Sequence, residues 1–316
     1  MCRIVDFRLH FVVSAISEFA LPARETARKQ AIFVAAEEKK ERIAGYSGEY
    51  CEAGSLLNKK RTWDVCENPL DCGRFEGEIF EMDRRLLYEG KSKSIYEGDN
   101  DSTYVMEFRN SATAGNGAKK AELEGKGELN ASISAVIYDY LAKNGIETHL
   151  IKMIDATHAL VKKTEIVPVE VIIRNTAAGS FSQKYGVSEG TPLKNTVVEF
   201  SLKSDELGDP MINGTQITAI GLAGKEEIDE MVRQALTING LLRALFDRSG
   251  IILVDFKLEF GRYEGRIILA DEITPDSCRL WDKQTGKKLD KDRFRRDLGD
   301  VMGAYTEVFT RLTDEK

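Results

Sequence analysis

From residue 82 onward, hydrophobic and polar positions follow the regular spacing of folded secondary structure. A period of two predicts strands over residues 86–90, 94–97 and 104–108, and turn residues separate the first two. Short strands joined by turns are typical of an antiparallel sheet.

Two longer stretches have the three-to-four-residue spacing of an amphipathic helix. The first covers residues 130–144, and Gly145 follows it at the position where glycine commonly ends a helix. The second covers residues 225–249, with apolar positions on one side and Gly250 after it. A terminal helix is predicted after Asp290.

The order of these elements indicates the fold class. Further strands are predicted over residues 158–162 and 168–173, and a hairpin over residues 251–273 follows the second helix. Grouped strands, followed by a mixture of helices and strands, lack the regular βαβ alternation of a doubly wound sheet. We therefore predict an α+β fold.

Residues 1–81 lack this patterning. A charged helix over residues 25–44 has only a thin apolar stripe, and residues 51–81 show little periodicity. We expect Met82 to be the natural start and residues 1–81 to be a poorly ordered or wrongly assigned leader. A genuine disordered extension is the alternative, and the intact mass of the protein from its own host distinguishes the two.

Composition narrows the class of protein. The 316 residues carry 45 Lys and Arg against 52 Asp and Glu, a formal net charge of −7 with no long basic run, which argues against a nucleic-acid partner. No stretch of about 18 apolar residues predicts a membrane span. Beyond residue 81 the only cysteine is Cys278, as expected of a reduced, cytoplasmic protein.

The strand over residues 251–260 carries the most informative charges. Its even-numbered positions from 252 are apolar and share one face, whereas Asp255, Lys257 and Glu259 share the other. Such a row is also typical of the solvated outer face of an ordinary strand. The candidate function therefore depends on what lies opposite.

The partner strand of this hairpin, residues 266–273, is almost wholly apolar until Asp271 and Glu272. Carboxylates that emerge there, opposite Glu259, suit Mg²⁺, which prefers one or two carboxylates together with substrate phosphates and water. Lys257, held between carboxylates, would be charged and available to a substrate anion.

Two further segments point to phosphate chemistry. The turn Gly90, Lys91, Ser92 and Lys93 matches neither a Walker A loop nor a GxGxxG motif. A hairpin turn with backbone N–H groups and lysines can nevertheless cover a triphosphate, as in protein kinases. An ordinary exposed turn is the alternative.

The second segment is a predicted buried strand that delivers Arg174 into a loop of small residues, 175–180. Small residues let the backbone approach a ligand, and a guanidinium binds phosphate or carboxylate through two parallel hydrogen bonds. Arg279, after Pro275, Asp276 and Ser277, is a second candidate of the same kind.

Together these segments resemble the SAICAR synthetase family. Residues 166–180 and 253–261 are similar to its two signature segments. Shorter segments that also look like the family are residues 87–93, 277–282 and 290–295. The resemblance covers residues 82–312 and leaves residues 1–81 without a counterpart.

The resemblance implies a two-lobed fold, with an antiparallel-sheet ATP-binding lobe over residues 82–165 and a larger α+β lobe for substrate and metal over residues 166–316. It implies an ATP-dependent ligase of de novo purine (IMP) biosynthesis. Such an enzyme joins L-aspartate to the carboxylate of carboxyaminoimidazole ribonucleotide (CAIR) and forms SAICAR, ADP and phosphate. A monomer and a homodimer both fit the sequence.

The resemblance also implies a role for each candidate residue. ATP would be bound by Gly90, Lys91, Ser92 and Lys93, with Lys93 as the main phosphate contact. Mg²⁺ would be held by Glu259 and Asp271. Substrates would be bound by Arg174, Ser180, Arg279 and Arg295, the last of them for aspartate. Asp255 would contact substrate, and Lys257 would bridge ATP and CAIR.

One position departs from the family, and two other functions stay open. Asn116 stands where some members carry an aspartate. A small-molecule kinase could use the same ATP site with Asp255 as base, and a nucleotide-binding module would need no chemistry. The paired arginines, and a lysine between carboxylates, favour the ligase because they suit an anionic acceptor.

Overall fold

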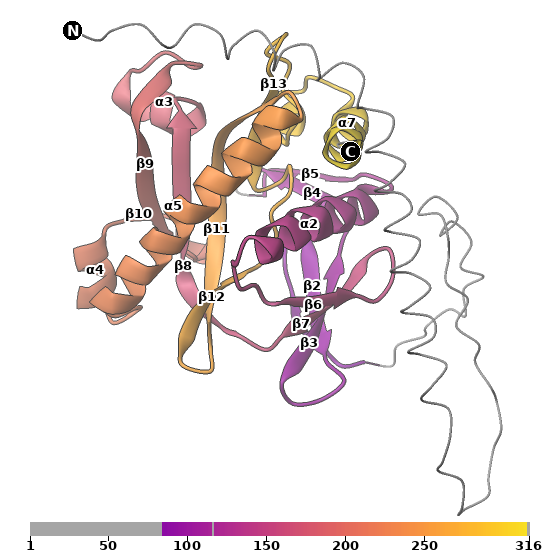
Figure 1. Cartoon of the computed structure of the whole chain (residues 1–316), viewed down its shortest axis with the longest axis vertical. Coiled ribbons are helices and arrows are strands. Elements are labelled where there is room, and N and C mark those ends of the chain that lie inside the picture. The colour runs from indigo at the N-terminus through magenta and orange to yellow at the C-terminus, as the bar shows by residue number, and fades with distance from the viewer. Residues whose placement is uncertain (1–83, 116, 315–316) are drawn as a thin grey trace, which may run out of the picture. The chain divides into compact units, whose positions relative to one another are not determined.

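The computed structural model describes residues 84–115 and 117–314 (Figure 1). The predictions made for residues 1–81 and for Asn116 lie outside the described residues.

The first part of the described chain forms an antiparallel sheet of five strands in the order β1-β2-β3-β7-β6. The strands are β1 (Leu86–Glu89), β2 (Lys93–Glu97), β3 (Thr103–Phe108), β6 (Leu150–Met153) and β7 (His158–Lys162). A separate hairpin follows β3 and consists of β4 (Ser111–Ala114) and β5 (Lys119–Glu122). The sequence pattern predicted the first three strands, although β1 is exposed along its whole length and only β2 and β3 have buried positions.

Helix α2 (Lys126–Lys143) connects the hairpin to β6 and begins four residues before its predicted start. Ile133, Ile137 and Leu141 recur every four residues and are fully buried. Gly145, just beyond the helix, has a φ of +82°, the left-handed conformation that glycine adopts without strain. The periodicity therefore predicted the buried face and the end of the helix better than its start.

A second antiparallel sheet provides most of the core. Its path is β10-β9-β8-β11-β12, and β13 also pairs with β11. The strands are β8 (Glu165–Thr176), β9 (Pro192–Leu202), β10 (Met211–Ile212), β11 (Ile251–Tyr263), β12 (Arg266–Ala270) and β13 (Cys278–Asp282). The long helix α5 (Lys225–Arg248) runs along one face of this sheet (Figure 1).

The core lies between α5 and this sheet. Met231, Ile238 and Leu242 of α5 are fully buried in one cluster with Val169 and Ile173 of β8. Because successive side chains of a strand alternate in direction, the intervening residues Glu170, Ile172 and Arg174 face away from α5 and line a cavity. That opposite face is the one available for chemistry.

Short helices complete the fold. They are α3 (Gly179–Tyr185), the 3-10 turn η1 (Asp205–Leu207), α4 (Gly214–Ala219) and α6 (Asp292–Arg295). The terminal helix α7 (Val301–Thr313) packs against α2. Among the described helices, none is both long and apolar enough to cross a membrane.

The predicted α+β class is confirmed, but the predicted phase of β11 is wrong at its start. Ile252 was expected on the apolar face, yet it is 36% exposed, whereas Leu253 is 4% exposed and lies in the core. The cause is a register shift between Leu253 and Asp255, where β11 pairs with β13. An irregularity of this kind moves the following side chains to the opposite face.

Candidate active site

A cavity of about 700 Å³ lies where the two sheets and the β4–β5 hairpin meet. Every candidate site residue of the sequence analysis lines this cavity. These residues are Gly90, Lys91, Ser92, Lys93, Arg174, Ser180, Asp255, Lys257, Glu259, Asp271, Arg279 and Arg295. The fold thus gathers segments that are far apart in sequence, and the role of each residue stays a prediction.

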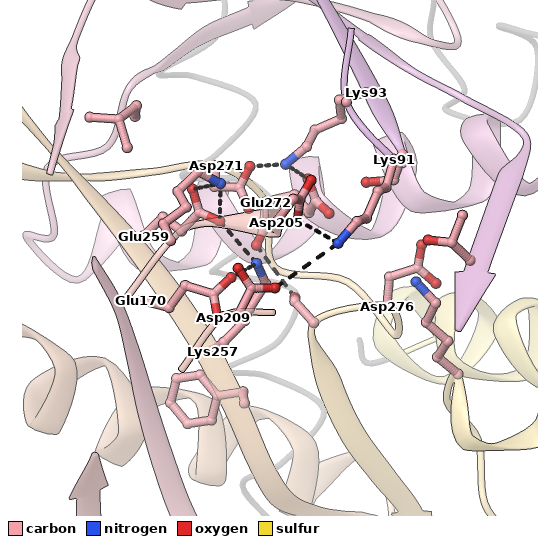
Figure 2. Close-up of a pocket in the computed structure, with 18 of the residues that line it drawn as sticks. Lys91, Lys93, Glu170, Asp205, Asp209, Lys257, Glu259, Asp271, Glu272 and Asp276 are labelled. Atoms are coloured by element: carbon pink, nitrogen blue, oxygen red, sulfur yellow. Dashed lines mark hydrogen bonds and ion pairs between the residues drawn. The ribbon is translucent and has the colours of Figure 1, made fainter. Parts of the chain in front are cut away.

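One wall of the cavity is the charged row of β11, which was predicted from alternation. Lys257 Nζ lies 2.6 Å from Glu170 Oε1 on the neighbouring strand β8 and 2.9 Å from Glu259 Oε1 (Figure 2). Burial alone would lower the pKa of Lys257, but the carboxylates of Glu259 and Glu170 outweigh it and raise that pKa. Lys257 is therefore a permanent cation in the neutral pH range.

Glu259 is the most enclosed carboxylate of this row and is 3% exposed. The Lys203 ammonium also lies 2.9 Å from its carboxylate. Burial would raise the pKa of Glu259, but Lys257, Lys203 and Lys93 together hold it far below the ordinary value. Glu259 is accordingly ionised and faces a cluster of cations.

The two lysines of the β1–β2 turn reach across the cavity. Lys93 Nζ forms ion pairs with Asp271 and Glu272, and Lys91 Nζ lies 2.5 Å from Asp205 Oδ1 (Figure 2). Burial lowers the pKa of Lys93 despite the nearby carboxylate of Glu272. The side chain of Lys93 is 15% exposed and that of Lys91 is 44% exposed, so Lys93 is the more enclosed cation.

Asp271 follows β12 in a left-handed conformation with a φ of +64°, which is uncommon for a residue other than glycine. Tyr138 Oη donates to its carbonyl oxygen at 3.0 Å, and His149 Nε2 donates to the same oxygen at 2.9 Å. Backbone conformations of this kind are often found at functional sites. Here two hydrogen bonds from buried side chains hold Asp271 at the cavity wall.

The carboxylate oxygens of Glu259 and Asp271, the predicted metal ligands, are of the kind that Mg²⁺ prefers. The Lys93 ammonium lies between Asp271 and Glu272, so a cation already occupies a place between two carboxylates. Among the described residues, no group of three or more His, Cys, Asp or Glu is arranged to hold a metal ion. A hard cation here would take one or two of these carboxylates and complete its shell with substrate oxygens, which is the usual mode of Mg²⁺.

A second wall of the cavity is an arginine–carboxylate cluster. Arg174 NH1 lies 3.1 Å from Asp255 Oδ2, and Arg279 NH1 lies 2.8 Å from the same oxygen. Burial raises the pKa of Asp255, although Arg279 and Arg174 oppose it. Both guanidinium groups line the cavity and suit a phosphate or a carboxylate.

Arg279 and Arg295 are held through a shared buried acid. Arg279 Nε donates to Asp292 Oδ2 at 3.0 Å, and Arg295 NH1 donates to Asp292 Oδ1 at 2.7 Å. Gly179 has a φ of +51°, and a Cβ there would overlap the guanidinium of Arg279. The small-residue loop noted in the sequence therefore lets α3 approach this arginine closely, and Ser180 Oγ accepts from Arg174 at 3.4 Å.

Sequence reasoning missed several charged residues that line the cavity or that pair directly with a residue of its lining. Lys126 at the start of α2 is fully buried, and its Nζ lies 2.7 Å from Asp276 Oδ2. Tyr305 Oη of α7 donates to the other oxygen of Asp276 at 2.5 Å. Burial would raise the pKa of Asp276, but Lys291 and Lys126 lower it to about 2. Glu170 and Lys203 also line the cavity and were missed, whereas Glu272 was noted beside Asp271 at the end of the hairpin strand.

The burial of His149 leads to a prediction about acid stability. Burial, helped by the charges of Lys93 and Lys162, lowers the pKa of His149 from 6.5 to about 3. Between these values an unfolded chain takes up a proton that the folded chain does not, so stability is complete above 6.5 and falls as the pH falls toward 3. Relative to His149→Gln, the native chain should lose up to about 1.4 kcal/mol of unfolding free energy per pH unit.

Urea unfolding of both proteins at about pH 7 and about pH 5 measures this difference. Other titrating groups are common to the two proteins, so their contributions cancel in the comparison. Parallel changes in unfolding free energy over that range would show that His149 is protonated in the folded protein.

The family model for SAICAR synthetase matches residues 86–312. The phosphoribosylaminoimidazole-succinocarboxamide synthase of Clostridium acetobutylicum is 49% identical over 230 residues, which are 73% of this chain and 98% of that protein. The synthase of that name from Nautilia profundicola is 53% identical over 234 residues, which are 73% of this chain and 100% of that protein.

Solved structures agree. The crystal structure of phosphoribosylaminoimidazole-succinocarboxamide synthase from Ehrlichia chaffeensis has a TM-score of 0.71 and 42% identity, covering 73% of this chain and 100% of that one. A SAICAR synthetase in complex with ADP has a TM-score of 0.71 and 44% identity, covering 73% of this chain and 99% of that one. The resemblance seen in the sequence is thereby confirmed, and the chain belongs to the SAICAR synthetase family.

Proposed function

We propose that this chain joins L-aspartate to the carboxylate of CAIR with ATP and forms SAICAR, ADP and phosphate in purine biosynthesis. The observation that carries the proposal is one cavity with three kinds of groups. It holds a lysine turn facing carboxylates, a pair of arginines around Asp255, and the cation Lys257. Membership in the SAICAR synthetase family supports the same reaction.

ATP binds at the β1–β2 turn in this proposal, with Gly90 and Ser92 supplying backbone and Lys91 and Lys93 supplying charge. The relative solved in complex with ADP supports an ATP site in the family fold. Glu259 and Asp271 would hold Mg²⁺, which when bound neutralises charge on the reacting phosphates. Glu272, which shares Lys93 with Asp271, would be an additional donor.

CAIR binds on the arginine side. Arg174, Arg279 and Ser180 would hold the phosphate of the ribonucleotide, and Asp255 keeps the two guanidinium groups side by side. Arg295 lines the same cavity and is assigned to a carboxylate of aspartate. This division leaves Lys257 between the two substrate regions.

The reaction needs a good leaving group, because a carboxylate is a poor electrophile. A carboxylate oxygen of CAIR attacks the γ-phosphorus of ATP and ADP leaves; the aspartate nitrogen then attacks the acyl carbon, phosphate leaves and the nitrogen loses a proton. Lys257 stays protonated and neutralises charge that develops on the transferred oxygens. Positioning and charge neutralisation are the main contributions a protein makes to phosphoryl transfer.

The arrangement around Asp255 argues against the kinase alternative. A kinase needs a carboxylate base that is free to accept a proton from a hydroxyl group. The two oxygens of Asp255 instead accept hydrogen bonds from Arg279, and one of them also from Arg174. This carboxylate is engaged in holding the arginines.

We assign the reaction to the cytoplasm, since Cys278 is a free, buried thiol of the kind that persists in a reducing compartment. Nucleic acid and membranes are not partners in this proposal. Light scattering during size-exclusion chromatography would distinguish a monomer from a homodimer.

A coupled assay of ADP release tests the function. Full-length protein with ATP and Mg²⁺ should release ADP rapidly only when CAIR and aspartate are both present, and SAICAR should accumulate in equal amount. Equal ADP release without aspartate would point to a kinase or a simple ATPase, and an absence of SAICAR would contradict the ligase.

A further inference from the structure

Two asparagines form a reciprocal amide pair behind the arginine cluster. Asn175 of β8 donates from Nδ2 to Oδ1 of Asn239 on α5 at 2.8 Å, and Asn239 donates back from Nδ2 to Asn175 Oδ1 at 3.0 Å. Asn239 is 4% exposed in the largely apolar layer between α5 and the sheet. A buried polar pair in such a layer is costly unless its hydrogen bonds are satisfied, so its placement needs an explanation.

The pair joins four elements at one point. Asn175 Nδ2 also donates to the backbone oxygen of Leu253 on β11 at 3.3 Å. Thr196 of β9 donates to Asn175 Oδ1 at 3.3 Å and accepts from Asn239 Nδ2 at 3.3 Å. Through these bonds α5 is tied to β8, β9 and β11 at the same level of the sheet.

Two of the register shifts of this sheet occur at this level. The pairing of β8 with β9 shifts between Arg174 and Thr176, and the pairing of β11 with β13 shifts between Leu253 and Asp255. Arg174 and Asp255 are themselves directly opposite each other in the β8–β11 pairing. The asparagine pair therefore lies beside the two bulges that flank this substrate-facing pair.

The bulge of β11 decides where Asp255 points. In a regular strand, residues two apart share a face. Leu253 nevertheless lies in the core and Asp255 lines the cavity, so the shift between them turns the carboxylate toward Arg174 and Arg279. The hydrogen bond from Asn175 to the Leu253 carbonyl oxygen holds the backbone at the residue where this change of phase begins.

We propose that Asn175 and Asn239 are positioning residues that hold these bulges and thereby fix Arg174 and Asp255 for binding of the ribonucleotide. The inference rests on the proposed role of the arginine cluster in binding CAIR. An amide serves here because each asparagine must donate and accept at once, which neither an apolar nor a charged side chain of that size does. Neither asparagine lines the cavity, so the pair acts through Arg174 and Asp255.

The test compares Asn239→Ala with Gln234→Ala in the full-length enzyme. Gln234 is a matched control because it is also buried on α5 and donates to a strand carbonyl, Ile267 O, at 2.7 Å. Both variants should lower Tm. Only Asn239→Ala should raise KM for CAIR, by about 10-fold, the size expected when a buried amide loses its partner. KM for ATP should change by less than about 3-fold in both variants, because the lysine turn belongs to the other sheet.

Two further variants keep the test decisive. Thr196→Val has the same shape as the native residue and removes only the hydroxyl group, so it should fold and raise KM for CAIR by about 3-fold. In the double variant that carries both Asn175→Ala and Asn239→Ala, KM for CAIR should be no higher than in whichever single variant has the higher KM. This is expected because the two residues act as a unit.

An unchanged KM for CAIR in both Asn239→Ala and Thr196→Val, with a fall in Tm like that of Gln234→Ala, would overturn the inference and leave the pair a structural feature. A native enzyme that shows no CAIR-dependent ADP release would instead overturn the proposed function. The two failures are thus distinguished by the behaviour of the native protein.

Discussion

Lys93→Met is expected to lower kcat/KM for ATP by about 10²- to 10³-fold, the loss typical of removing one charged or hydrogen-bonding group from a transition state. Lys93 is enclosed by Asp271 and Glu272 on the far side of the cavity, and its side chain is 15% exposed. A buried cation is screened little by water, so it neutralises phosphate charge more effectively than an exposed one. Initial rates with ATP varied at saturating CAIR and aspartate measure the loss.

The neighbouring lysine provides a graded comparison. Lys91 is more exposed and pairs with Asp205, so Lys91→Met should lower kcat/KM by no more than about 10-fold. Lys119→Met is the matched control, because its Nζ forms another long-range ion pair, 2.5 Å from Asp297, outside the cavity. A larger effect at Lys91 than at Lys93 would reverse our assignment of the main phosphate contact.

The candidate residues of β11 could be predicted because alternation is a local property of a strand. Asp255, Lys257 and Glu259 share the cavity face as the period of two requires. The same rule failed at Ile252, because β11 has a register shift between Leu253 and Asp255 in its pairing with β13, a strand from a later segment of the chain. Local patterns predict the faces of a strand only as far as its pairing is regular.

Partners that come from distant segments could not be read from any local pattern. Glu170 is opposite Glu259 in the β8–β11 register, yet nothing in its own strand marks it as the partner of Lys257. Lys126 is separated from Asp276 by 150 residues and begins a helix whose start was predicted too late. That a lysine is buried can be predicted only once the fold shows which carboxylate pairs with it.

The Asn175–Asn239 pair illustrates the same limit. Asn175 belongs to the small-residue loop that the sequence singled out, whereas Asn239 lies on the predicted helix among apolar residues. Judged by helical periodicity alone, Asn239 only interrupts the apolar face of the helix and has no evident role. Only the sheet register shows that it lies behind Arg174 and Asp255.

Glu259→Gln is expected to lower kcat by about 10²- to 10³-fold while the protein stays folded. Glutamine has the same shape, so packing around this enclosed position is preserved and only the negative charge is lost. Lys257 then keeps Glu170 as its carboxylate partner, and the proposed Mg²⁺ site loses one of its two predicted donors. Circular dichroism and Tm establish folding, and steady-state rates at saturating substrates establish the loss.

Glu165→Gln is the matched control for this loss of charge. Glu165 also joins β8 to β11, since Arg262 Nη1 lies 2.8 Å from its Oε1. This ion pair is outside the cavity, so kcat of Glu165→Gln should stay within about 2-fold of the native value.

Raising the Mg²⁺ concentration separates the two effects of Glu259→Gln. If the carboxylate acts chiefly as a metal donor, excess Mg²⁺ restores part of kcat, because weaker binding is overcome by mass action. If it acts chiefly on Lys257, kcat stays low at every Mg²⁺ concentration, and near-normal turnover at ordinary Mg²⁺ would remove Glu259 from both roles.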